Sequence, residues 1–97
     1  MKEIGLITGR DALIMHFYTQ EDWDSFEDLI NTLNKFFKAN VTKRVDGPES
    51  KFVIIKIDDS ELTLINNPYG NSLKAETDDS KKVLQKIYED WNLFSKL

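Results

Sequence analysis

The sequence predicts an α+β fold, in which an antiparallel sheet of five to six strands carries two amphipathic helices. Several short stretches alternate apolar and polar residues and are joined by tight turns, which is typical of paired strands. Two longer stretches, 21–39 and 79–94, instead repeat their apolar residues at helical spacing. We expect the order β-β-α-β-β-β-α. A single α+β domain should span residues 1–97, because this length suffices for one domain and not two.

The first two strands are expected at 3–8 and 12–19. Gly9 followed by Arg10 favours a two-residue type II′ turn, which prefers glycine at its first position. Such a turn would place Leu6 opposite Leu13 on the neighbouring strand, and Ile4 opposite Met15. Phe17 follows on the same side, so this wholly apolar face should point into the core.

The helix expected at 21–39 begins with acidic residues and ends with basic ones. Its apolar stripe contains Trp23, Phe26, Ile30, Leu33 and Phe37, widened by Leu29 and Phe36. Thr19 is a suitable N-cap. Carboxylates near the N-terminus are favoured by the helix dipole, which is a complete structural explanation for them. The functional alternative is that Asp24, Glu27 and Asp28 form part of an acidic recognition surface.

The stretch 41–45 is predicted to be a short strand with Val41 and Val45 on one face. Lys43 and Arg44 suit an edge strand, because charged side chains discourage further pairing. The turn at 46–48 then leads into the most apolar stretch of the chain, 52–66.

Residues 52–66 are expected to form a hairpin whose tip is Asp58, Asp59, Ser60 and Glu61. A two-residue loop at 59–60 or a four-residue loop at 58–61 gives the same register. That register places Ile57 opposite Leu62 and Ile55 opposite Leu64. All four side chains should be buried. A last strand at 72–76, with Leu73 and Ala75 inward, precedes the second helix, which Thr77 or Asp78 would cap.

The second face of the predicted sheet also carries apolar side chains: Ile7, Ile14, Tyr18, Phe52, Ile54 and Ile65. If both helices cover the first face, these residues form an exposed apolar surface. In that case Ile54 and Ile65 are candidates for contact with a partner or with a second copy of the chain. If one helix covers each face, the same residues belong to the core. The sequence is compatible with both arrangements.

Composition excludes several classes of function. The chain has no Cys, which excludes disulfides and thiol catalysis and suits a reducing compartment. The net charge of −4 leaves no basic face for nucleic acid, and no apolar run is long enough to span a membrane. The single histidine, His16, has no nucleophile at a recognisable spacing, so we expect neither catalytic residues, nor a metal site, nor a cofactor.

The remaining candidates for binding lie in the hairpin tip and in the loop 67–71. Asp58, Asp59 and Glu61 lack the glycine and the oxygen spacing of a calcium loop, and their structural explanation is a solvated turn. The functional alternative is that they contact a basic protein. Tyr69 is a candidate aromatic anchor, although such a tyrosine commonly packs against the edge of a sheet.

The Cys-free, acidic character of this short chain, its acidic helix start and its Asp58–Glu61 tip resemble the small immunity proteins that neutralise bacterial toxins. These include the immunity proteins of contact-dependent inhibition systems. The resemblance implies a non-enzymatic cytoplasmic protein that binds a cognate toxin domain, often a basic nuclease, and blocks its active site or substrate surface. It assigns no role to an individual residue. The alternatives are a homodimeric structural or adaptor protein and, third, a small hydrolase that uses carboxylates.

Overall fold

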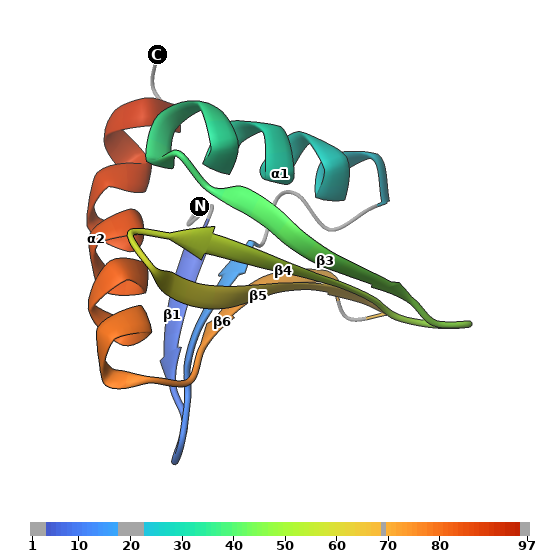
Figure 1. Cartoon of the computed structure of the whole chain (residues 1–97), viewed down its shortest axis with the longest axis horizontal. Coiled ribbons are helices and arrows are strands. Elements are labelled where there is room, and N and C mark those ends of the chain that lie inside the picture. Colours follow the sequence, from blue (N-terminus) through green and yellow to red (C-terminus); the bar gives the residue numbers. More distant parts are fainter. Residues whose placement is uncertain (1–3, 18–22, 69, 96–97) are drawn as a thin grey trace.

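The computed structural model describes residues 4–17, 23–68 and 70–95, with the side chains of 23–25 and 92–95 outside the description. Six strands and two helices follow one another in this part of the chain (Figure 1). They are β1 (Ile4–Thr8), β2 (Leu13–Phe17), α1 (Trp23–Phe37), β3 (Asn40–Asp46), β4 (Lys51–Ile57), β5 (Ser60–Asn67), β6 (Gly70–Ala75) and α2 (Asp78–Ser95). The predicted α+β class and the predicted five to six strands are confirmed, although the predicted order left out one of the six.

The strands form one antiparallel sheet in the order β1-β2-β6-β5-β4-β3. Strands that are neighbours in the sequence pair with each other, except that β2 pairs with the distant β6. The strands β1 and β3 are the two edges of the sheet. The edge position predicted for β3 from Lys43 and Arg44 is therefore confirmed.

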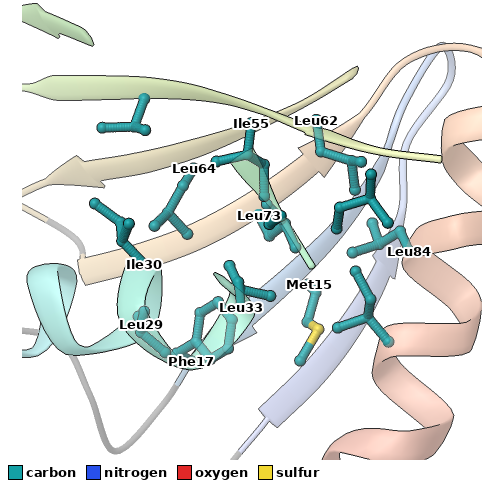
Figure 2. Close-up of a cluster of buried hydrophobic side chains, with 14 of the residues drawn as sticks. Met15, Phe17, Leu29, Ile30, Leu33, Ile55, Leu62, Leu64, Leu73 and Leu84 are labelled. Carbon is teal, nitrogen blue, oxygen red and sulfur yellow. The ribbon is translucent and has the colours of Figure 1, made fainter. Parts of the chain in front are cut away.

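Both helices lie on the same side of the twisted sheet (Figure 1). Alternate strand residues point toward them and pack with the helices into one buried cluster (Figure 2). The sheet contributes Ile4, Met15, Phe17, Val53, Ile55, Ile57, Leu62, Leu64, Leu73 and Ala75, and the helices contribute Phe26, Leu29, Ile30, Leu33, Leu84, Ile87 and Trp91. We call this side of the sheet the core face and the other side the open face. The first of the two arrangements that the sequence allowed is the one observed.

The helix α1 ends at Phe37, two residues before the predicted end at Ala39. Lys38 adopts a left-handed conformation with φ of 58°, which takes the chain out of the helix. The N–H of Ala39 then donates to the carbonyl of Leu33 at 3.2 Å, and the Asn34 side chain donates to the carbonyl of Ala39 at 2.8 Å. These two bonds fix the course of the chain as it leaves the helix. Thr19, the predicted N-cap, lies outside the described residues.

The helix α2 begins after a cap formed by Thr77, one of the two predicted residues. The Ser80 N–H donates to Thr77 Oγ1 at 3.1 Å, and the Thr77 N–H donates to Ser80 Oγ at 2.9 Å. This reciprocal pair is a capping box in which serine takes the place usually held by glutamate. Ser80 is fully buried, so the bonds also satisfy its hydroxyl group inside the protein.

The pairing predicted for β1 and β2 is wrong by two residues. Leu6 lies opposite Met15, and not opposite Leu13 as predicted. The Gly9 N–H donates to the Ala12 carbonyl at 2.8 Å, so the turn is centred on Arg10 and Asp11. Gly9 does not adopt the positive φ that a type II′ turn requires. Ile4 consequently opposes Phe17 and not Met15. The same side chains still reach the core, because a shift of two residues preserves the face.

The predicted register of β4 and β5 is wrong by the same amount. Asp58 and Asp59 both have positive φ, 49° and 67°, and form a two-residue turn of type I′ geometry. The resulting pairs replace the predicted ones: Ile57 with Ser60, Ile55 with Leu62, and Val53 with Leu64. The buried set predicted for this hairpin is nevertheless confirmed, since these aliphatic residues remain on the core face.

The two valines of β3 do not share a face, contrary to the prediction. A β-bulge between Val41 and Lys43 changes the alternation along this strand. Val41 pairs with Ile55 on the core side, whereas Val45 pairs with Phe52 on the open face. Every residue of β3 is exposed.

Candidate protein-binding surface

The open face carries the two residues predicted to contact a partner, Ile54 and Ile65. In the register of the sheet, Val45, Phe52 and Ile65 are consecutive neighbours across three strands, and Ile54 lies beside them on β4. Val45 is 42% exposed and Phe52 is 38% exposed, whereas Ile54 and Ile65 are half-buried. We call these four residues the open-face patch. Neither described helix covers it.

A second apolar feature is a pocket where the end of α1, the β4–β5 turn and the middle of α2 meet. Figure 1 shows the turn beside α2, below the C-terminal end of α1. The cavity has a volume of about 340 Å³. It is lined by Phe36, Phe37, Lys38, Ile57, Asp58, Val83, Lys86, Ile87 and Asp90. We call it the junction pocket.

The junction pocket combines an apolar base with charges of both signs. Ile57 and Ile87 are buried and provide apolar surface, whereas the ring of Phe36 is 36% exposed at the opening. Lys35 lies over the Phe36 ring, with its Nζ 5.2 Å from the ring centroid.

Four charged side chains line the junction pocket: Lys38, Asp58, Lys86 and Asp90. None of them forms an ion pair with another described residue. Their charges are therefore available to a ligand that enters the pocket.

Two of the lining residues have an unusual backbone conformation. Lys38 ends α1 with φ of 58°, and Asp58 opens the β4–β5 turn with φ of 49°. Left-handed geometry costs a residue that carries a Cβ about 1–2 kcal/mol. In Lys38 it turns the chain from α1 into β3, and in Asp58 it closes the hairpin. The same two bends bring these segments to the pocket.

Carboxylates gather at the end of the sheet next to the pocket. Since the strands are antiparallel, the end of β4, the start of β5 and the end of β6 lie together there. The carboxylates are Asp58, Asp59, Glu61, Glu76, Asp78 and Asp79. Lysines approach two of them, with Lys56 at 3.9 Å from Asp59 and Lys74 at 3.7 Å from Glu76. We call this region the acidic end, because its six carboxylates outnumber the four lysines of the same segments, Lys56, Lys74, Lys81 and Lys82.

The structure divides the acidic candidates between two places. Asp58, Asp59 and Glu61 belong to the acidic end. Glu27 instead accepts two bonds from the Arg44 guanidinium, at 3.0 and 3.5 Å. Arg44 lies opposite Val53, and Asp58 is five residues farther along β4, about 16 Å away at the rise of a strand. The start of α1 and the hairpin tip therefore do not form one surface.

The other candidates contribute less to a site. Asp28 is exposed on α1, where its carbonyl accepts a bond from Thr32 Oγ1 at 2.9 Å. The Asp24 side chain and Tyr69 lie outside the described residues. His16 is half-buried on the open face. No group of three or more His, Asp or Glu side chains in the described part of the chain is placed to hold a metal ion.

Sequence reasoning missed most of the junction pocket. It placed Phe36 in the apolar stripe of α1, whereas the ring is partly exposed. Lys86 and Asp90 were not among the predicted site residues, although they lie one helical turn apart on α2, beside Val83 and Ile87. That spacing indicates a polar strip next to an apolar one. It does not indicate that the β4–β5 turn reaches the same place.

Neither helix, as far as each is described, is long and apolar enough to cross a membrane. Comparison of the sequence with family models, with curated proteins and with solved structures finds no match in any of the three.

Proposed function

We propose that this protein is a non-enzymatic binding module that neutralises a cognate bacterial toxin by covering its active site or substrate surface. The partner is a basic domain, such as a nuclease domain, that inserts an apolar side chain into the junction pocket. The observation that carries the proposal is the position of this pocket beside the acidic end, with Asp58 belonging to both. Two carboxylates and two lysines border the apolar cavity itself, and the acidic end beside it is complementary to lysine or arginine residues that flank the inserted apolar side chain.

The two parts of this surface contribute differently to binding. The pocket and the exposed ring of Phe36 supply apolar contact, which dominates affinity when a few residues become fully desolvated. The acidic end acts at longer range, because a concentration of one charge accelerates encounter with a partner of the opposite charge. The association rate should therefore fall as salt is added, while the dissociation rate depends mainly on the pocket.

The class of partner is inferred from the resemblance to immunity proteins in length, charge and architecture. On that proposal both proteins meet in the cytoplasm, where an immunity protein protects the cell that makes it. The toxin is inhibited by steric occlusion, so this chain needs no catalytic residue, metal or cofactor.

Two phenylalanines provide a matched test. Phe36 at the junction pocket and Phe52 in the open-face patch are 36% and 38% exposed, so alanine should disturb folding similarly at both. The wild-type protein is used to capture partners from the native host, and binding of the purified partner is then measured for each variant. We expect Phe36→Ala to weaken binding by at least about tenfold, as a hot-spot residue does, and Phe52→Ala to leave it unchanged.

A combined Asp58→Asn and Asp59→Asn variant tests the acidic end in the same assay. We expect slower association and a weaker dependence on salt, with a smaller effect on dissociation that comes from Asp58 in the junction pocket. A partner whose binding resists both Phe36→Ala and the asparagine changes would show that this surface is not the interface. A captured protein without toxic activity would retain the binding site and reject the toxin as its target.

The open face supports a second candidate, a homodimeric structural or adaptor protein. Both helices cover the core face, which leaves the open-face patch available to a second copy. On this alternative, light scattering at micromolar concentration gives the mass of a dimer, and Phe52→Lys converts it to a monomer. A monomeric wild-type protein under these conditions contradicts the alternative.

A further inference from the structure

The junction pocket has the make-up of a small-molecule site. Its volume of about 340 Å³ lies near the lower end of the roughly 300–1,000 Å³ that is usual for ligand pockets. Such pockets combine a mainly apolar lining with a few polar groups that fix the orientation of the ligand. Here the apolar lining comes from Phe36, Phe37, Ile57, Val83 and Ile87. The pocket therefore suits a small ligand that has an apolar part.

The face of α2 that lines the pocket carries an apolar row beside a charged one. Val83 and Ile87, four residues apart, form the apolar row. Lys86 and Asp90, at the same spacing, form the charged row. Helical residues four apart have their Cβ atoms about 5–6 Å from each other. A ligand that lies along this face can thus place its apolar part on one row and two opposite charges on the other.

Lys86 and Asp90 are available to a ligand, because the described structure contains no ion pair between them. Ion pairs at this spacing are favoured when the acidic residue precedes the basic one, and the order here is the reverse. Lys38 and Asp58 supply a second cation and a second anion, from the end of α1 and from the β4–β5 turn. The walls of the pocket are therefore complementary to a ligand that carries one charge of each sign.

We propose that the junction pocket binds a free α-amino acid with a large apolar side chain, such as phenylalanine. The ammonium and the carboxylate of this ligand are attached to one carbon atom, so both fit within the single helical turn between Lys86 and Asp90. Lys86 binds the carboxylate and Asp90 binds the ammonium. The side chain of the ligand lies on the apolar row of α2, where the ring of Phe36 offers it an aromatic contact. A residue inside a protein chain has neither of the two backbone charges, so the full pattern is met by a free amino acid.

A free amino acid in this pocket would regulate the binding of the protein partner. The ligand and the apolar side chain of the partner use the same lining, so they exclude each other. This regulation rests on the proposed function, whereas binding of the amino acid does not. Free phenylalanine should therefore weaken partner binding in proportion to its occupancy of the pocket.

The direct test is a titration of the protein alone with L-phenylalanine, followed through the amide chemical shifts. We expect shifts at the residues of the pocket and a dissociation constant of about 1 mM or below, as suits a ligand of this size. The analogues 3-phenylpropionate and 2-phenylethylamine lack the ammonium and the carboxylate, respectively. Each should bind about fivefold more weakly, because one charged contact at an open site is lost. L-Alanine keeps both charges and loses the ring, and should bind at least about tenfold more weakly.

Two pairs of variants assign the charged contacts. Lys86→Gln and Asp90→Asn each remove one charge from the pocket, and each should weaken phenylalanine binding about fivefold. Lys86→Gln should not weaken the binding of 2-phenylethylamine, which has no carboxylate, and Asp90→Asn should not weaken that of 3-phenylpropionate, which has no ammonium. The matched controls are Lys82→Gln and Glu89→Gln, at exposed positions of α2 outside the pocket lining. Both should bind phenylalanine like the wild type.

The inference is overturned if phenylalanine at about 10 mM, roughly ten times the expected dissociation constant, leaves the shifts of the pocket unchanged. It is also overturned if either analogue binds as tightly as phenylalanine, or if the control substitutions weaken binding as much as Lys86→Gln and Asp90→Asn. A partner whose binding requires Phe36, with a pocket that takes up no amino acid, would reject this inference alone. Phenylalanine that binds in the pocket and fails to compete with the partner would retain the amino-acid site and reject the insertion of a partner side chain there.

Discussion

The Glu27 carboxylate on α1 is held by the Arg44 guanidinium on β3, with oxygen–nitrogen distances of 3.0 and 3.5 Å. The pair links a helix to an edge strand and gives Glu27 a structural role. Both side chains remain partly exposed, at 42% and 47%, so solvent screens the attraction. We expect Glu27→Gln to lower the free energy of unfolding by only about 0.5 kcal/mol.

A double-mutant cycle with Arg44→Gln isolates this contact. Urea denaturation should give a coupling energy of less than about 1 kcal/mol, decreasing further at high salt. Partner binding should be unaffected by Glu27→Gln, because the pair lies far from the junction pocket. A large loss of affinity in this variant would move the interface toward the start of α1.

Trp91 of α2 connects the two helices to the sheet. Its ring stacks on Phe37 of α1, with centroids 6.4 Å apart, and meets Phe17 of β2 edge-on at 5.2 Å. Trp91 is buried, so Trp91→Ala removes a large side chain and leaves a cavity. We expect a loss of about 3–5 kcal/mol, a large part of the stability of a small domain. Denaturant titration measures it, and Trp91→Phe, which keeps a ring, should cost markedly less.

The cap of α2 should contribute measurably to stability. Thr77→Ala removes the oxygen that accepts the Ser80 N–H, and also one of the three groups bonded to the buried Ser80 hydroxyl, which keeps its bonds to the N–H and the carbonyl of residue 77. We expect a loss of about 1 kcal/mol, with Thr77→Ser close to the wild type because it keeps the hydroxyl. Thermal unfolding detects this difference as a shift of several degrees in a domain of this size. Equal losses for alanine and serine would show that the methyl group of Thr77, and not its hydroxyl, stabilises the helix.

The sequence predicted the buried face of each strand better than it predicted which residues pair across neighbouring strands. The alternation of Val53, Ile55 and Ile57 with polar neighbours specifies a face, and a shift of two residues leaves that face unchanged. The register depends on turn geometry. Asp58 and Asp59 both take positive φ without the glycine that usually indicates such a turn. The bulge at Val41 had no local signal either.

The candidate site was harder to predict, because it is assembled by tertiary packing. The hairpin tip was recognised from its run of carboxylates. The rest of the pocket comes from the end of α1 and from α2, which are distant from the tip in the sequence. Whether the helices covered one sheet face or both could not be decided, since Ile54 and Ile65 give the open face an apolar pattern like that of the core face. Packing of Trp91 against both Phe17 and Phe37 is the contact that unites the helices on one side.

Substitutions in the β4–β5 turn should stabilise the protein and at the same time weaken its binding to a basic partner. Asp58→Asn with Asp59→Gly introduces the residues that type I′ turns prefer, at φ values of 49° and 67°. We expect a gain of about 1 kcal/mol, seen as a rise of about 4–8 °C in the unfolding midpoint. The two lost carboxylates should slow association with a basic partner. Asp59→Gly alone is the control, because it relieves the backbone and keeps Asp58 at the junction pocket. Should both variants bind as fast as the wild type, the turn carboxylates take no part in recognition.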